Sequence, residues 1–252
     1  MTEHTERDFD TSSMTLHGIH AGVLFVNGNE VSTTNDDRLL VLPGDASLAN
    51  SAAIQEVTRS AGERGATSIV AYPEEFKSWD VSGLNGVEVF NVYTNARQIN
   101  PVVAFFDALW SRRSYPDLLF ALYYERPHES LKKWDGAISR GRSTAVAGND
   151  AHANIGVSLR DSAGKTLLGI QLDPYEVSFR LVRMHVLVEQ NKPLDQASLL
   201  EALRAGHCFI GFDFLGDTSG FSFSVESQGQ TKIQGDEITL QGDTRLRVKT
   251  PV

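Results

Sequence analysis

Short apolar runs that end at Gly, Pro or Asn alternate with segments of helical spacing through the first 212 residues, and this alternation most constrains the fold. The runs have the length and the flanking turn residues of buried strands. They are Ala21–Val26, Arg38–Leu42, Ser68–Tyr72, Val87–Asn91, Thr144–Ala147 and Cys208–Phe212. Helical spacing covers Ser51–Arg64, Pro101–Trp110, Leu118–Tyr124, Leu131–Ser139 and Ser198–Ala205. The alternation predicts an α/β fold with a largely parallel sheet, open or closed into a barrel.

The pattern changes at Phe221. Side-chain polarity then alternates in the segments FSFSVES, DEITL and TRLRVKT, which are separated by Gly-containing turns. Period-two alternation is typical of half-buried strands, so we expect a short antiparallel β segment. The sequence therefore predicts one domain over residues 1–220 and a β tail over residues 221–252, which is too short to close a sandwich by itself.

Charge and cysteine content exclude several classes of function. The chain has 252 residues and a net charge of −9, which disfavours a nucleic-acid partner because phosphate binding needs a surplus of Lys and Arg. Cys208 is the only cysteine, so neither an intrachain disulfide nor a Cys-rich zinc site can form. The sequence has no signal-like leader and no stretch long enough to span a membrane. We expect a cytoplasmic protein without a membrane partner, unless an N-terminal signal peptide is missing from this sequence.

The sequence also lacks several well-known motifs. It contains no GxxxxGK[ST] phosphate loop, no GxGxxG fingerprint, no GxSxG elbow and no CxxC. These absences disfavour nucleotide-loop, dinucleotide and serine-hydrolase chemistry.

Four segments place acidic, imidazole or phenol side chains at strand ends, where α/β folds gather their active sites. The four segments are Thr2-Glu3-His4, Gly28-Asn29-Glu30, Ala71-Tyr72-Pro73 and Gly148-Asn149-Asp150-Ala151-His152. A carboxylate and an imidazole two residues apart, as in Asp150 and His152, can converge on Zn²⁺, Mn²⁺ or Fe. Alternatively, Asp150 caps a helix and His152 is structural, and Asp-x-His alone favours this alternative.

Two further positions have open interpretations. Glu30 follows an apolar run, which leaves two alternatives. Either a metal or another cation holds its carboxylate, or Glu30 is the first solvated residue beyond the strand. His207 follows a predicted helix end and is adjacent to Cys208. A nucleophilic Cys-His pair needs a geometry that adjacency cannot supply, so we consider His207 only as pocket lining.

Taken in order, these segments resemble the polymerase and histidinol phosphatase (PHP) superfamily of metal-dependent hydrolases. Thr2-Glu3-His4 is similar to its Thr-Asp-His segment, Gly28-Asn29-Glu30 to its Gly-x-Glu, and Gly148–His152 to its Gly-[Ser/Asn]-Asp-Ala-His. Gly86–Asn91 resembles the Ile-Glu-Val-Tyr-Asn strand of the branch that includes carbaryl hydrolases. Leu199–Phe212 and the β tail are also similar to that branch, so the resemblance covers nearly the whole chain.

The resemblance implies a distorted (β/α)7 barrel that is N-terminally incomplete, because the family's His-x-His strand is absent from this sequence. It also implies two or three divalent ions (Zn, Mn or Fe) in a complete site. His4 and His152 would share one ion, Asp150 and Glu30 another, and Glu30, Asp150 and His152 would be catalytic. Tyr72 stands where the family has a His ligand. We expect Glu3, Tyr72, Asn91 and His207 to support the ligands or to contact the substrate.

The implied function is hydrolysis of small phosphoesters by metal-activated water, with carbamates or carboxylic esters as other substrates. The departures from the family pattern leave an alternative: a degenerate, inactive binding scaffold or a truncated fragment. A barrel that lacks a strand also has unpaired edges, so we expect self-association through them.

Overall fold

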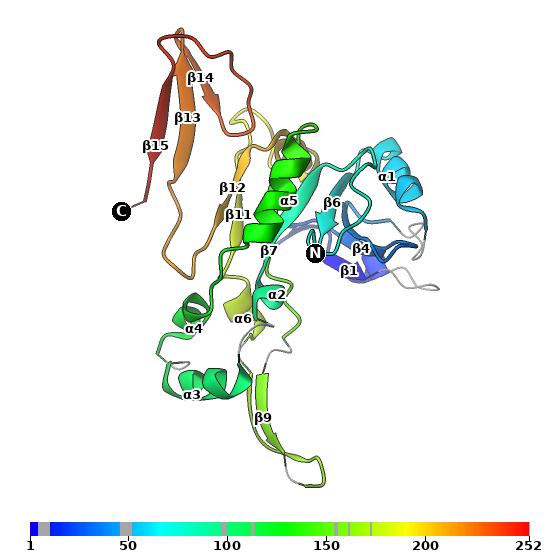
Figure 1. The fold of residues 1–252 in the computed structure, drawn as a ribbon, viewed down its shortest axis with the longest axis vertical. Helices are drawn as coiled ribbons and strands as arrows, with labels where there is room; N and C mark the ends of the chain where they lie inside the picture. Colours follow the sequence, from blue (N-terminus) through cyan, green and yellow to red (C-terminus); the bar gives the residue numbers. More distant parts are fainter. Residues whose placement is uncertain are drawn as a thin grey trace.

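The computed structural model describes residues 1–4, 11–45, 52–96, 100–111, 114–153, 156–160, 162–171 and 173–251. Its main feature is a six-stranded sheet with the order β1-β4-β5-β6-β7-β8 (Figure 1). The strands are β1 (Thr2–His4), β4 (Gly28–Ser32), β5 (Arg38–Leu42), β6 (Thr67–Ala71), β7 (Gly86–Asn91) and β8 (Thr144–Gly148). Four of the predicted runs therefore form neighbouring strands of one sheet.

The sheet is mainly parallel. β1 runs parallel to β4, and β6, β7 and β8 run parallel to one another, whereas β5 is antiparallel to both of its neighbours. The reversal at β5 follows from a tight turn, in which the Thr33 amide donates to the Asp37 carbonyl at 2.9 Å. Such a short connection allows a hairpin but no crossover. The prediction of an α/β fold with a largely parallel sheet is confirmed.

The described helices are α1 (Ile54–Glu63), α2 (Val92–Ala96), α3 (Pro101–Ser111), α4 (Pro116–Leu122), α5 (His128–Ile138), α6 (Tyr175–Ser178) and α7 (Gln196–Ala205), and Thr11–Met14 form a 3-10 turn. They confirm the predicted helices to within a few residues at each end. Ser51 and Val252, which belong to predicted segments, lie outside the described residues. Within the described part of the chain, no helix combines the length and apolar character needed to cross a membrane.

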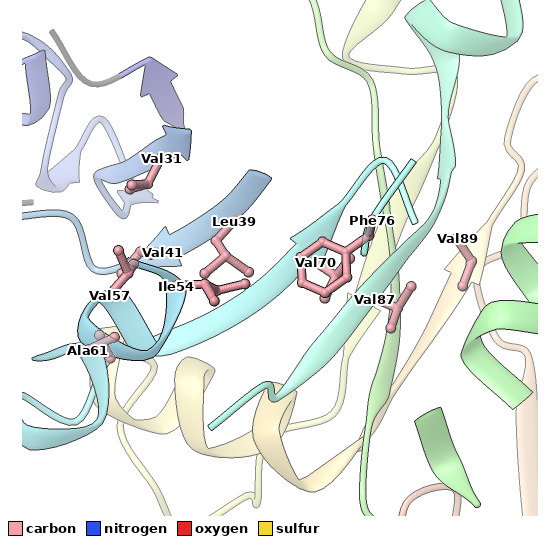
Figure 2. Close-up of a cluster of buried hydrophobic side chains, with 11 residues drawn as sticks. Val31, Leu39, Val41, Ile54, Val57, Ala61, Val70, Phe76, Val87 and Val89 are labelled. Carbon is pink, nitrogen blue, oxygen red and sulfur yellow. The ribbon is translucent and has the colours of Figure 1, made fainter. Parts of the chain in front are cut away.

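The main core lies on one face of the sheet (Figure 2). Val31, Leu39, Val41, Val70 and Val87 are almost fully buried, and they contact the apolar side of α1 and, through Val87 and its neighbours, residues of α5. Successive side chains of a strand point to opposite faces. The residues next to these in the strands, including Glu30, Arg38 and Glu88, therefore project from the other face.

Four smaller sheets accompany the main sheet in the described part of the chain. They are the hairpins β2 (Gly18–His20)–β3 (Val23–Phe25), β9 (Gly156–Arg160)–β10 (Thr166–Gln171) and β11 (Arg183–Val186)–β12 (Cys208–Gly211), and the tail sheet β14 (Gln230–Ile233)–β13 (Ser222–Ser227)–β15 (Arg245–Lys249). The β9–β10 hairpin and the tail sheet lie at opposite ends of the molecule (Figure 1). The antiparallel tail is confirmed. Self-association through an edge strand stays a prediction.

Two strand predictions were wrong in position. Ala21–Val26 was expected to be buried, but β3 belongs to a surface hairpin in which Val23 is 54% exposed. The buried strand is β4, whose sequence GNEVS mixes polar and apolar residues and so lacks the apolar run that predicts a buried strand. In the tail, Asp236–Leu240 forms no strand, because Asp236 makes a turn with Ile233 and the second strand precedes it as β14.

Candidate functional site

Polar side chains gather where the carboxyl ends of the parallel strands meet. His4 ends β1, Asn91 ends β7, Tyr72 follows β6 directly, and Asp150 comes two residues after β8. β5 runs in the opposite direction, so its first residue, Arg38, lies at the same edge and pairs with the last residue of β6. Parallel strands bring their carboxyl ends to one side of a sheet, which explains why residues so far apart in sequence converge.

The first part of the cluster is built around the Glu30 carboxylate. Glu30 lies inside β4, in register with His4 of β1, and its side chain is only 8% exposed. The Arg38 Nη1 donates to Glu30 Oε1 at 3.2 Å, and His4 Nδ1 lies 3.7 Å from the same oxygen. Glu30 is therefore a buried strand residue whose carboxylate is held by a cation, and that cation is the Arg38 guanidinium.

The second part is built around the Asp150 carboxylate. The Asn91 amide donates to Asp150 Oδ2 at 3.2 Å, and the Tyr72 hydroxyl donates to the same oxygen at 3.4 Å. His152 Nδ1 lies 3.2 Å from Asp150 Oδ1 and 2.8 Å from the Asp150 carbonyl oxygen. The Tyr93 ring packs against the His152 ring, with 5.4 Å between the centroids.

Arg38 joins the two parts, because its guanidinium carbon lies 5.0 Å from the centroid of the Tyr72 ring. This is cation–π distance. A continuous chain of contacts thus connects six of the residues singled out in the sequence, and these are His4, Glu30, Tyr72, Asn91, Asp150 and His152.

The backbone is unusual at the same place. Tyr72 has a φ of 49° and Asp150 a φ of 47°, both in the left-handed region. Asp tolerates this conformation better than most residues, but a bulky Tyr rarely adopts it. Backbone strain of this kind is concentrated at functional sites, where the surrounding structure enforces it. The two hydrogen-bonded side chains, Tyr72 and Asp150, are therefore held in position at a cost in conformational energy.

Glu88 in the middle of β7 belongs to the cluster, although it is not among the residues predicted from the sequence. Its Oε2 accepts a hydrogen bond from the Asn91 amide at 3.3 Å. The pKa of Glu88 is raised to about 8, mainly by burial and in addition by the negative charges of Asp150 and Glu30, while the Asn91 hydrogen bond opposes this rise. A carboxylate inside an apolar interior strand was the available signal, since burying a charge is costly without a partner.

Tyr72 remains a phenol near neutral pH. Burial and, secondarily, the charges of Asp150, Glu30 and Glu88 raise its pKa well above the ordinary value, and Arg38 opposes this only in part. Tyr72 is therefore a hydrogen-bond donor to Asp150 rather than an anionic metal ligand.

A pocket of about 320 Å³ adjoins the cluster and shares Tyr72, Glu88 and Asn91 with it. It extends past α2 to the start of α5, where it is lined by His128, the first residue of the helix, and by Arg126 just before it. A volume of this order suits part of a small molecule. The pocket therefore provides space for a ligand directly beside the polar cluster.

Two of the predicted residues have other contacts. His207 lies outside the cluster, where its Nε2 is 2.9 Å from Asp236 Oδ1. Glu3 is exposed, and its carboxylate accepts a hydrogen bond from the His4 backbone amide at 3.3 Å rather than from the imidazole. Gly206 ends α7 in the left-handed conformation, directly before His207.

The cluster fits a divalent ion in the type of its donors but not in their number. Within the described residues, no three His, Cys, Asp or Glu side chains converge on one point. Asp150 and His152 provide one adjacent carboxylate and imidazole, and His4 and Glu30 provide another pair that already contacts Arg38. Two side-chain donors are fewer than the three or four of most zinc sites.

The chain matches no known family model and no curated protein. Its resemblance to the PHP superfamily therefore stays a prediction from its own residues.

Proposed function

We propose that this chain is a metal-dependent hydrolase of phosphoesters with a PHP-type distorted (β/α)7 barrel, and that the cluster around Asp150 is its active site. The observation that carries the proposal is the continuous chain of contacts from His4 to His152, which connects residues in or just after six strands. Residues 1–220 would form this domain, with residues 221–252 as the β tail.

Asp150 and His152 would hold a divalent ion (Zn, Mn or Fe), and His4 and Glu30 form the second carboxylate–imidazole pair of the cluster. A bound ion would supply a nucleophile at neutral pH by lowering the pKa of water and would withdraw charge from the phosphoryl oxygens. Tyr72 and Asn91 fix the orientation of the Asp150 carboxylate through their hydrogen bonds.

Glu88 gives the site a proton donor. It lines the pocket, and its raised pKa of about 8 keeps its carboxyl group largely protonated near neutral pH. A group of this kind can donate a proton to the leaving oxygen of a substrate in the pocket. A carbamate or a carboxylic ester would need the same attack by water and the same protonation, so these esters are further candidate substrates.

A second candidate function is a degenerate, inactive scaffold that binds a small molecule. Two contacts favour it: Glu30 pairs with Arg38, and the Tyr72 hydroxyl donates a hydrogen bond to Asp150. The resemblance implies that these two carboxylates bind metal ions instead. In that case the pocket would bind its ligand without turning it over.

The two functions differ in turnover. We expect the purified chain to release p-nitrophenol from p-nitrophenyl phosphate or bis-p-nitrophenyl phosphate in the presence of Mn²⁺, and Asp150→Asn to abolish this. His207→Asn, which lies outside the cluster, is the matched control and should retain the activity. Equal background rates for all three proteins, with folding intact, would refute the hydrolase and favour the scaffold.

A further inference from the structure

Arg38 contacts both parts of the candidate site. Its Nη1 lies 3.2 Å from Glu30 Oε1, and its guanidinium carbon lies 5.0 Å from the centroid of the Tyr72 ring. Its position follows from the topology, because β5 is antiparallel and places its first residue beside the end of β6. The ion pair and the ring contact therefore fix the guanidinium between Glu30 and Tyr72.

The charge of Arg38 is permanent, and this distinguishes it from a bound metal ion. A guanidinium keeps its proton at every pH at which proteins are folded. The Glu30 carboxylate is 8% exposed and needs a positive partner, because an unpaired buried charge is strongly unfavourable. Arg38 already provides this partner, and its positive charge repels a divalent ion from the same carboxylate.

We propose that Arg38 is a built-in cation that takes the place of a metal ion at Glu30, so that the site binds one divalent ion, at Asp150 and His152, rather than two or three. The inference rests on the proposed function for the ion at Asp150. The part of the inference that concerns Glu30 rests only on the ion pair between Arg38 and Glu30. Glu30 and His4 are then positioning residues of a metal-free half of the site.

The test is the number of Mn²⁺ ions bound per chain, measured by isothermal titration calorimetry and by elemental analysis after equilibrium dialysis. The wild-type chain should bind one ion, and Arg38→Gln should bind two, because the guanidinium no longer repels a second ion from Glu30 and His4. Arg38→Lys keeps the charge and should bind one. Arg142→Gln, whose arginine pairs with Glu237 far from the cluster, is the matched control and should also bind one.

Thermal unfolding gives a second measurement that does not depend on activity. Arg38→Gln removes the guanidinium charge beside the buried Glu30 carboxylate, so its Tm should be lower than that of the wild type in the absence of metal. Mn²⁺ should raise the Tm of Arg38→Gln more than that of the wild type, since binding to the folded state stabilises it.

The outcomes separate this inference from the proposed function. If the wild type binds no ion and Arg38→Gln binds one that Glu30→Gln removes, the ion at Asp150 is refuted but the role of Arg38 is supported. If Arg38→Gln and the wild type bind the same number of ions, including none, the inference is overturned. It is also overturned if the wild type binds two ions and loses one in Glu30→Gln.

Discussion

Glu88 of β7 lies against Gly148 of β8, so closely that a Cβ atom at position 148 would be 2.5 Å from Glu88 Oε1. Cβ atoms in real proteins essentially never come this close to a non-bonded heavy atom. The glycine therefore leaves room for a buried carboxyl group between two parallel strands, at a position two residues before Asp150. The position of Glu88, and with it its hydrogen bond to Asn91, depends on the absence of a side chain at residue 148.

We predict that Gly148→Ala displaces the Glu88 carboxyl group and lowers the free energy of unfolding by about 1–3 kcal/mol, as overpacking in a core does. Gly136→Ala is the matched control, because its new Cβ, in the last turn of α5, meets no atom within 4 Å. That change should stabilise the chain by about 1 kcal/mol through helix propensity. Urea denaturation measures both effects, and equal stabilities of the two variants would be inconsistent with the close contact.

The second prediction concerns Glu88 and pH. The folded-state pKa of about 8 lies above the ordinary value of 4.5, so the folded chain holds this proton more tightly than the unfolded chain does. The contribution of Glu88 to stability is therefore fully present below about pH 4.5 and decreases as the pH rises toward about 8, by at most about 5 kcal/mol.

Glu88→Gln removes this titration but keeps the shape of the side chain. Its free energy of unfolding should decrease less than that of the wild type between about pH 5 and about pH 8.5, and it should be the more stable protein at the higher pH. Urea denaturation at both pH values measures the difference. Parallel pH profiles for the two proteins would show that Glu88 titrates normally.

Tyr72→His tests whether position 72 limits metal binding. A neutral imidazole offers a lone pair where the Tyr72 hydroxyl offers a proton, and His adopts the observed φ of 49° more readily than Tyr. We expect the affinity for Mn²⁺ to rise by about tenfold, or about 1.4 kcal/mol. Tyr72→Phe keeps the ring beside Arg38 without the hydroxyl and should bring no gain. An equal gain in both variants would show that the imidazole is not a ligand.

Much of the fold followed from local patterns. The apolar runs of β5 and β6 and the helical spacing of α1 predict those elements because the same residues form the core that the structure shows. β4 could not be predicted as a buried strand because its residues Asn29 and Glu30 are polar. Their burial depends on partners elsewhere: Asn29 accepts a hydrogen bond from the Asp45 amide, and Glu30 pairs with Arg38.

The site was predictable in its location but not in its contacts. Side chains at the ends of parallel strands must converge, which brought His4, Asn91 and Asp150 together. The bond between Tyr72 and Asp150 joins residues 78 positions apart and depends on the order of the strands, which the pattern alone does not fix. His207 is the converse case, because its partner Asp236 lies in the tail, 29 residues further along the chain.

The most direct test of the account is the metal content of the purified chain after dialysis against Mn²⁺, Zn²⁺ or Fe²⁺, measured by elemental analysis. The account predicts bound metal in the wild type, its loss in Asp150→Ala/His152→Ala, and its retention in His207→Ala, which lies outside the cluster. Metal in all three proteins, or in none of them, would contradict an ion held by Asp150 and His152.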